Sequence, residues 1–164
     1  MITKKICMIG AFSVGKTSLV DRYVHSIFSD QYLSTVGVKI SKKAVMIDST
    51  ELSLVLWDME GKDDYQEINL AQLRGAMGVF LVADGLRRET LDVALSLREL
   101  SCSAAGNVPH ILLVNKVDMA DAWEVTKADM IRVEQEVGIP TLKTSAKTGQ
   151  GVDEAFLALA RAIL

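Results

Sequence analysis

The stretch that most constrains the fold is Gly10–Thr17, which reads Gly-Ala-Phe-Ser-Val-Gly-Lys-Thr and fits the pattern G-x-x-x-x-G-K-T. The apolar run Ile6–Ile9 before it predicts a buried strand, and the amphipathic run Ser18–Val24 after it predicts a helix. A strand, a glycine loop and a helix in this order are typical of a phosphate-binding site, with an ordinary glycine-rich turn as the alternative. The glycines let backbone N–H groups turn onto an anion, and the helix adds the positive end of its dipole. Lys16 is expected to neutralise phosphate oxygens, and the Thr17 hydroxyl to ligate Mg²⁺.

Composition limits the class of protein. The chain of 164 residues is 49% hydrophobic, which predicts one domain over residues 1–164 with a sizeable core. A net charge of −3, without a block of basic residues, argues against nucleic acid or an anionic membrane as the main partner. The apolar runs are too short for a membrane span, and no signal peptide is recognisable. Cys7 in a strand and Cys102 after a helix show no metal spacing, so we expect a reduced, cytoplasmic setting.

Apolar runs and alternating patterns predict strands that alternate with helices. Two of the strands are expected to be antiparallel and joined by a polar turn, and residues 61–74 are expected to form a mobile loop with irregular helix. The pattern predicts an α/β P-loop NTPase domain, in which a six-stranded, mostly parallel sheet carries helices on both faces. The expected strands are 6–9, 37–47, 51–58, 78–84, 110–115 and 141–144, and the expected helices are 18–24, 90–100, 126–137 and 151–164.

Two polar segments follow the last two strands and are suited to a purine base. In Asn115-Lys116-Val117-Asp118, the carboxylate can accept two hydrogen bonds from guanine N1–H and the 2-amino group. Adenine has no donor at N1, so such a site would reject it by ~10⁴-fold or more. Lys116 can lie across the base plane, with its stem packed on the ring. Thr144–Lys147 supplies a second loop, where a backbone N–H could meet guanine O6.

Two further polar positions are candidates for the metal and the terminal phosphate. Asp58 follows an apolar strand and is expected to hold the Mg²⁺ shell through water, with a simple strand-end cap as the alternative. Gly61 would let its backbone N–H approach the γ-phosphate. Thr35 is a candidate second hydroxyl ligand for Mg²⁺, or else a plain loop threonine.

Together these segments resemble the Ras superfamily of small GTPases, and within it the Rab branch most closely. The resemblance covers essentially the whole chain, and the motifs stand in the family order. It implies a GTP/GDP switch that uses Mg²⁺ and hydrolyses GTP, with Lys16, Gly61 and Lys62 at the catalytic positions. It implies metal contacts from Thr17, Thr35 and Asp58. The implied nucleotide contacts are Ser13, Val14, Gly15, Lys16, Thr17, Ser18, Phe28, Tyr32, Thr35, Gly61, Asn115, Lys116, Asp118, Ser145, Ala146 and Lys147.

The sequence departs from the family pattern at two positions near the γ-phosphate. Lys62 stands where the family carries a glutamine that orients water, and an ammonium donates hydrogen bonds but cannot accept them. Slow hydrolysis is therefore expected, with Lys62 either paired with the γ-phosphate or pointing into solvent. Phe12 is expected to crowd the space that receives an activating protein's arginine finger. No arginine occupies residues 32–40, so no built-in finger is expected there.

Partner proteins are expected at the two switch segments, Asp30–Val38 and Gly61–Gly75. Ile40 and Leu73 stand where the Rab branch carries aromatic residues, whereas Trp57 remains as a candidate partner contact or a half-buried strand residue. We expect a monomer in the cytoplasm that is peripheral at membranes through partners. No prenylation is expected, since the chain stops without a cysteine-bearing tail.

Two other functions remain open from the sequence. The first is a GTP-binding interaction module with little or no hydrolysis, which Lys62 favours. The second is an ATP-using P-loop enzyme, which the Asn115–Asp118 segment disfavours.

Overall fold

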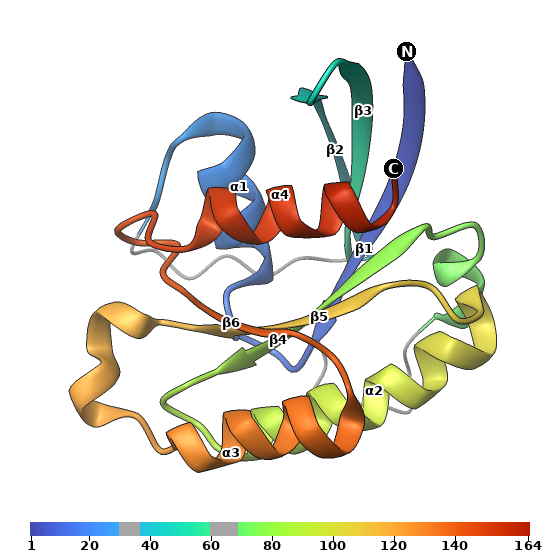
Figure 1. Cartoon of the computed structure of the whole chain (residues 1–164). Coiled ribbons are helices and arrows are strands. Elements are labelled where there is room, and N and C mark those ends of the chain that lie inside the picture. The colour runs from blue at the N-terminus through green and yellow to red at the C-terminus, as the bar shows by residue number, and fades with distance from the viewer. Residues whose placement is uncertain (30–36, 60–68) are drawn as a thin grey trace.

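An open six-stranded sheet with helices on both faces organises the described residues of the computed structural model, which are 1–29, 37–59 and 69–164 (Figure 1). The strands are β1 (Ile2–Gly10), β2 (Val38–Ile47), β3 (Thr50–Met59), β4 (Gly78–Asp84), β5 (His110–Asn115) and β6 (Thr141–Thr144). The α-helices are α1 (Lys16–His25), α2 (Glu89–Ala105), α3 (Lys127–Arg132) and α4 (Val152–Ala162). Short helical turns are the 3₁₀ segments η2 (Leu70–Leu73) and η3 (Val117–Ala122) and the π-helical turn η4 (Val133–Val137). The predicted fold class is confirmed.

The strand register sets up the site. The strand order is β2-β3-β1-β4-β5-β6, and among these strands only β2 runs antiparallel to its neighbour. The register pairs Met8 with Asp58, Asp84 with Asn115, and Asn115 with Thr144. The carboxyl ends of five parallel strands therefore lie along one edge of the sheet, where ligands bind in open α/β folds.

The two faces of the sheet are covered by different helices. Figure 1 shows α1 and α4 on one face and α2 and α3 on the other. Alternation along the strands feeds both layers, since Ile6 and Met8 of β1 pack with α1 and α4, and Cys7 packs with α2 and α3. β4 is buried at every position, as expected for a parallel strand that is covered on both sides.

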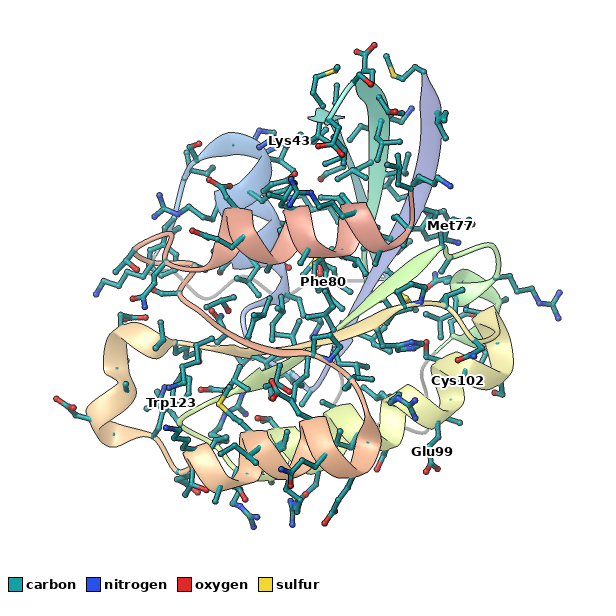
Figure 2. The ribbon with its side chains drawn as sticks, in the orientation of Figure 1. Lys43, Met77, Phe80, Glu99, Cys102 and Trp123 are labelled. Atoms are coloured by element: carbon teal, nitrogen blue, oxygen red, sulfur yellow. The ribbon has the colours of Figure 1, made fainter. Side chains whose placement is uncertain are left out.

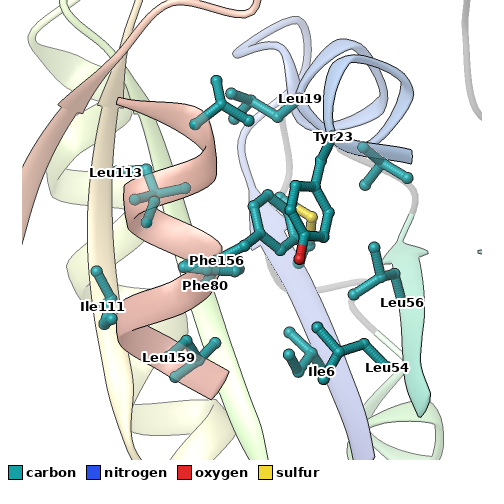
Figure 3. Close-up of a cluster of buried hydrophobic side chains, with 14 of the residues drawn as sticks. Ile6, Leu19, Tyr23, Leu54, Leu56, Phe80, Ile111, Leu113, Phe156 and Leu159 are labelled. Carbon is teal, nitrogen blue, oxygen red and sulfur yellow. The ribbon is translucent and has the colours of Figure 1, made fainter. Parts of the chain in front are cut away.

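Three aromatic rings join the helices of the first layer to the sheet (Figure 3). Tyr23 of α1 stacks on Phe156 of α4 with ring centroids 3.8 Å apart, and Phe80 of β4 meets Phe156 edge-on at 4.8 Å. Aromatic pairs in these geometries stabilise a core beyond the area that they bury. Helix α1 begins at the phosphate-binding segment. Its last turns, which carry Tyr23, are thereby fixed against the centre of the sheet.

The structure corrects two sequence expectations. Cys102 does not follow a helix, because α2 continues to Ala105 and places Cys102 within it (Figure 2). The reason is that the buried Ser101 hydroxyl pairs with Nε2 of His110 at 2.9 Å, which ties the last turns of α2 to β5. The expected helix at 126–137 is α only as far as Arg132, and the π-helical turn η4 completes it. Of the expected mobile segment 61–74, residues 61–68 lie outside the described residues.

Candidate functional site

The segment between β1 and α1 forms a loop around the Lys16 side chain. Lys16 is buried, and its Nζ donates hydrogen bonds to the carbonyl oxygens of Gly10 at 3.0 Å and Ala11 at 2.8 Å. Two of the three ammonium donors are thus used within the loop, and the third can reach a bound anion. Burial lowers the pKa of Lys16 to about 8, with Asp58 opposing the shift and Arg87 adding to it. The ammonium is therefore still protonated at neutral pH.

Glycine is required at both ends of this loop. A Cβ on Gly10 would lie 2.4 Å from the carbonyl oxygen of Val82 in β4. Gly15 has a φ of +102°, and a Cβ there would lie 2.3 Å from Nδ2 of Asn115. The loop therefore packs against β4 and β5 so closely that no side chain fits between them.

A hydroxyl and a carboxylate meet beside the loop. The Thr17 hydroxyl donates to Oδ2 of Asp58 at 2.5 Å, and Asp58 is fully buried at the end of β3. Within the described ranges the other oxygen, Oδ1, is buried without a hydrogen-bond partner. Burial raises the pKa of Asp58, while the Thr17 hydrogen bond and the charge of Lys16 oppose that shift. A buried carboxylate oxygen that lacks a partner, beside a hydroxyl, fits the hard oxygen ligands that Mg²⁺ prefers.

Asn115 connects three segments at the end of β5. Its Nδ2 donates to the carbonyl oxygen of Val14 at 3.0 Å. Its Oδ1 accepts from the Thr144 hydroxyl at 3.1 Å and from the Ala146 N–H at 3.3 Å. Asn115 and the residues of all three partners are buried, so water cannot easily replace these hydrogen bonds. The phosphate loop and the two base-side segments are thereby held as one unit.

The carboxylate proposed for the base is also held in place. Oδ1 of Asp118 accepts a hydrogen bond from the Ser145 hydroxyl at 2.7 Å, and Oγ of Ser145 in turn accepts from the Thr148 N–H at 3.0 Å. Arg22 of α1 donates through its guanidinium to the carbonyl oxygens of Ala146 and Lys147. The second base-side loop is therefore tied both to Asp118 and to the helix that follows the phosphate loop.

Trp123 closes the outer side of the Asn115–Asp118 segment. Its indole N–H donates to the carbonyl oxygen of Lys116 at 2.8 Å. The ring lies so close to Gly85 that a Cβ there would be 2.0 Å from it. The N–H groups of Glu124 and Val125 both donate to the Gly85 carbonyl oxygen. Figure 2 shows Trp123 beside the loops that follow β4 and β5.

The Lys116 ammonium has protein partners that the sequence did not predict. Its backbone has a φ of 74°, and its Nζ donates to the Ser13 carbonyl oxygen at 3.2 Å and to Oδ2 of Asp84 at 2.8 Å. The ammonium is therefore held at the phosphate loop, and only the stem remains available to a base. Asp84 also accepts from Arg87, whose Nη2 donates to the Phe12 carbonyl oxygen at 2.8 Å.

Sequence reasoning missed Arg22, Asp84 and Arg87. Asp84 carried a usable signal, because a charged residue at the carboxyl end of a buried parallel strand lies at the ligand edge. The two arginines carried none, since Arg22 bonds to a residue 124 positions away and Arg87 to one 75 positions away.

The remaining expected contacts are only partly covered by the structure. Ser18 lies in the first turn of α1, and Phe28 follows that helix with 36% of its surface exposed. The expected positions Tyr32, Thr35, Gly61 and Lys62 lie outside the described residues.

Candidate partner positions differ in exposure. Trp57 is half-buried, with Nζ of Lys5 3.6 Å from the ring centroid, and Ile40 beside it in the register is 49% exposed. Leu73 is fully buried, so it offers no surface to a partner in this conformation. No helix in the ranges that the structure describes has the length and apolar character needed to cross a membrane.

The fold and the site define a P-loop protein of the α/β class, with two further loops arranged beside the phosphate segment. Comparison with known sequences agrees: the family model described as "Ras family" matches residues 5–164. "Ras-related protein Rab-13" of Canis lupus familiaris is 35% identical over 161 residues, which cover 98% of this chain and 79% of that protein. "Ras-related protein Rab-8B" of Homo sapiens is 34% identical, with 98% of this chain and 78% of the relative covered. "Ras-related protein Rab-4" of Dictyostelium discoideum is 35% identical, with coverage of 98% and 78%.

The chain belongs to the Ras family and is Rab-like. The resemblance noted from the sequence is therefore confirmed. Rab-like members of this family are GTP-binding switches with GTPase activity and a role in vesicle transport. This chain is therefore a small GTPase of the same general function.

Proposed function

We propose that residues 1–164 form one domain that binds GTP and GDP with Mg²⁺ and hydrolyses GTP slowly. The observation that carries this proposal is the Asn115 side chain, which bonds the phosphate loop to both base-side segments. A single buried amide thus sets the spacing between the phosphate end and the base end of one ligand. A nucleotide is the ligand class that has these two ends.

The roles at the phosphate end follow from the contacts. Lys16 would neutralise phosphate charge with its remaining donor, and the backbone N–H groups of residues 13–18 would surround the phosphates. Thr17 and Asp58 would hold Mg²⁺, with Thr35 as a further ligand, and the ion would neutralise phosphate charge. Stabilising the charge that develops on the phosphates is the main catalytic contribution of such a site.

Guanine specificity would come from Asp118. Ser145 uses part of the bonding capacity of Oδ1 and fixes the carboxylate plane. The carboxylate would accept from N1–H and the 2-amino group, while the Ala146 and Lys147 segment faces O6 and Phe28 lies against the base. Adenine has neither an N1–H nor a 2-amino group, so bound ATP would leave this carboxylate without these two donors.

The nucleotide preference is tested by purifying the chain and identifying what remains bound. We expect GDP or GTP at near-stoichiometric occupancy, and competition against fluorescent GDP should show GTP displacing it at far lower concentration than ATP. Asp118→Ala should lose this discrimination, whereas Asp121→Ala, an exposed residue of the same short helix, should keep it. A purified chain that neither carries nor binds guanine nucleotide would overturn the proposal.

Slow hydrolysis is proposed on the chemistry of Lys62, because an ammonium cannot accept a hydrogen bond from the attacking water. Single-turnover hydrolysis should be faster in Lys62→Gln than in wild type. Lys62→Ala, which removes the ammonium without adding an amide, should stay slow. A Lys62→Gln rate no higher than that of Lys62→Ala would refute this account. Absence of phosphate release over hours in all three would favour the interaction module with no hydrolysis.

Partners would be effector and regulator proteins that contact the switch segments Asp30–Val38 and Gly61–Gly75. Ile40 and Trp57 lie next to the first of these segments and would extend the contact surface. The protein would act as a cytoplasmic monomer and reach membranes through such partners.

A further inference from the structure

Two cationic side chains donate hydrogen bonds to successive carbonyl groups of the phosphate loop. Nη2 of Arg87 donates to the Phe12 carbonyl oxygen at 2.8 Å, and Nζ of Lys116 donates to the Ser13 carbonyl oxygen at 3.2 Å. Both cations share one carboxylate, because Oδ2 of Asp84 accepts from Nε of Arg87 at 3.1 Å and from Nζ of Lys116 at 2.8 Å. Since Asp84 comes from the end of β4, this cluster is anchored to a fully buried strand.

The two carbonyl groups belong to the peptide units on either side of Ser13. The orientation of these two units determines the φ and ψ angles of Ser13. Its φ is 63°, in the left-handed region that residues with a side chain rarely adopt. The hydrogen bonds from Arg87 and Lys116 therefore fix a conformation that a serine would otherwise leave.

The same geometry orients two donors of the loop. In a trans peptide unit the N–H points opposite to the C=O. With the Phe12 and Ser13 carbonyls directed at the cations, the N–H groups of Ser13 and Val14 point the other way, into the loop. Backbone N–H groups that converge in this manner bind anions.

The charge of the cluster acts in the same direction. Two cations share a single carboxylate, so the group carries one net positive charge next to the loop. This charge lies directly beside the loop, since Arg87 and Lys116 both donate to carbonyl groups of the loop itself. A net positive charge beside the phosphate loop favours a polyanionic ligand.

We propose that Arg87 is a positioning residue of the phosphate loop, which holds the Ser13 and Val14 N–H groups toward the β-phosphate of a nucleoside diphosphate. The proposal rests on the proposed function, because it specifies how that nucleotide is held. Arginine suits this position because Nε and Nη2 lie at two points of one planar group and reach Asp84 and the Phe12 carbonyl at the same time, whereas a lysine at position 87 would place all its donors on one nitrogen.

The test compares Arg87 variants with a matched change at the next residue. Arg88 forms a two-bond ion pair with Asp129, at 2.7 Å and 3.2 Å, so Arg88→Ala removes the same side chain and charge outside the site. We expect Arg87→Ala to weaken GDP binding about 10-fold, which corresponds to about 1.4 kcal/mol. Arg87→Lys should recover only part of this loss, and Arg88→Ala should bind GDP as wild type does.

GMP provides the readout that separates positioning from general damage. GMP lacks the β-phosphate, so Arg87→Ala should weaken GMP binding much less than GDP binding in competition with fluorescent GDP. An equal loss for GDP and GMP, or a GDP affinity equal to that of Arg88→Ala, would overturn the proposal. If Arg87→Ala does not fold, Arg87→Gln carries the same comparison. A wild-type chain that binds neither nucleotide would instead contradict the proposed function.

A double-mutant cycle tests the link to Ser13. Glycine adopts a positive φ without strain, so Ser13→Gly should reduce the need for the Arg87 hydrogen bond. The GDP loss caused by Arg87→Ala should therefore be smaller in the Ser13→Gly background. An equal loss in both backgrounds would show that Arg87 does not act by holding the Ser13 backbone.

Discussion

Replacing Asn115 with alanine should damage folding and ligand binding together. The substitution removes three hydrogen bonds, to the Val14 carbonyl, the Thr144 hydroxyl and the Ala146 N–H. These partners belong to residues with at most 3% of their surface exposed, so water cannot easily replace the lost amide. Each buried group that is left unsatisfied costs roughly 1–3 kcal/mol, so the free energy of unfolding should fall by at least about 3 kcal/mol.

The measurement is equilibrium unfolding in urea, without nucleotide and at saturating GDP. Thr144→Val is the matched control, because it removes one of the three hydrogen bonds and leaves Asn115 Oδ1 with the Ala146 donor. We expect a loss of about 1 kcal/mol for this control. In Asn115→Ala, the stabilisation by GDP should also shrink, because the loops that contact the two ends of the nucleotide are no longer joined. A loss no larger than that of Thr144→Val would refute the assigned role of Asn115.

Three further predictions concern the same protein. Asp118→Asn should weaken GDP binding by roughly 10³-fold, because the amide keeps only one of the two oxygen acceptors. The same change should improve binding of xanthosine diphosphate, whose 2-carbonyl accepts from the new N–H. Calorimetry with both nucleotides checks this. Gly15→Ala should lose roughly 100-fold in GDP affinity in the same assay. The added Cβ would push Asn115 away, and an alanine would be strained at the Gly15 φ of +102°. Burial lowers the pKa of His110 below its ordinary 6.5, despite the opposing hydrogen bond to Val108. The unfolded chain therefore binds more protons, and stability should fall as the pH drops below about 6.5. The slope should flatten in His110→Gln, and an unchanged slope in urea unfolding would contradict the assignment.

Continuous apolar runs made most of the sheet predictable from the sequence. The bounds of β4, β5 and β6 agree with the predicted strands at 78–84, 110–115 and 141–144. For β4 and β5 the reason is that strands covered on both faces contain few polar residues, whereas β6 is a short edge strand with polar residues at three of its four positions. The end of α2 was not predictable in this way. Residues 101–105 are small and carry no apolar stripe, and the Ser101 contact with His110 depends on a neighbour in space.

The candidate site likewise has features that could be predicted from local sequence and features that could not. The phosphate loop and the Asn115–Asp118 segment could be recognised, because their chemistry lies within eight or fewer consecutive residues. The position of the Lys116 ammonium could not, since it depends on Asp84 from another strand and on a backbone φ of 74°. Charged side chains that bridge loops distant in sequence are decided by the tertiary structure alone, and Arg22 and Arg87 are of this kind.

The position of Trp123 also gives this protein an optical probe of its own. The chain has two tryptophans, and one of them, Trp57, lies on β3 beneath the Lys5 ammonium. A Trp57→Phe variant would keep a single indole, whose N–H is bonded to the backbone of the Asn115–Asp118 segment. Its emission would then follow the arrival and departure of unlabelled guanine nucleotide in real time, without a dye on the ligand that itself alters affinity.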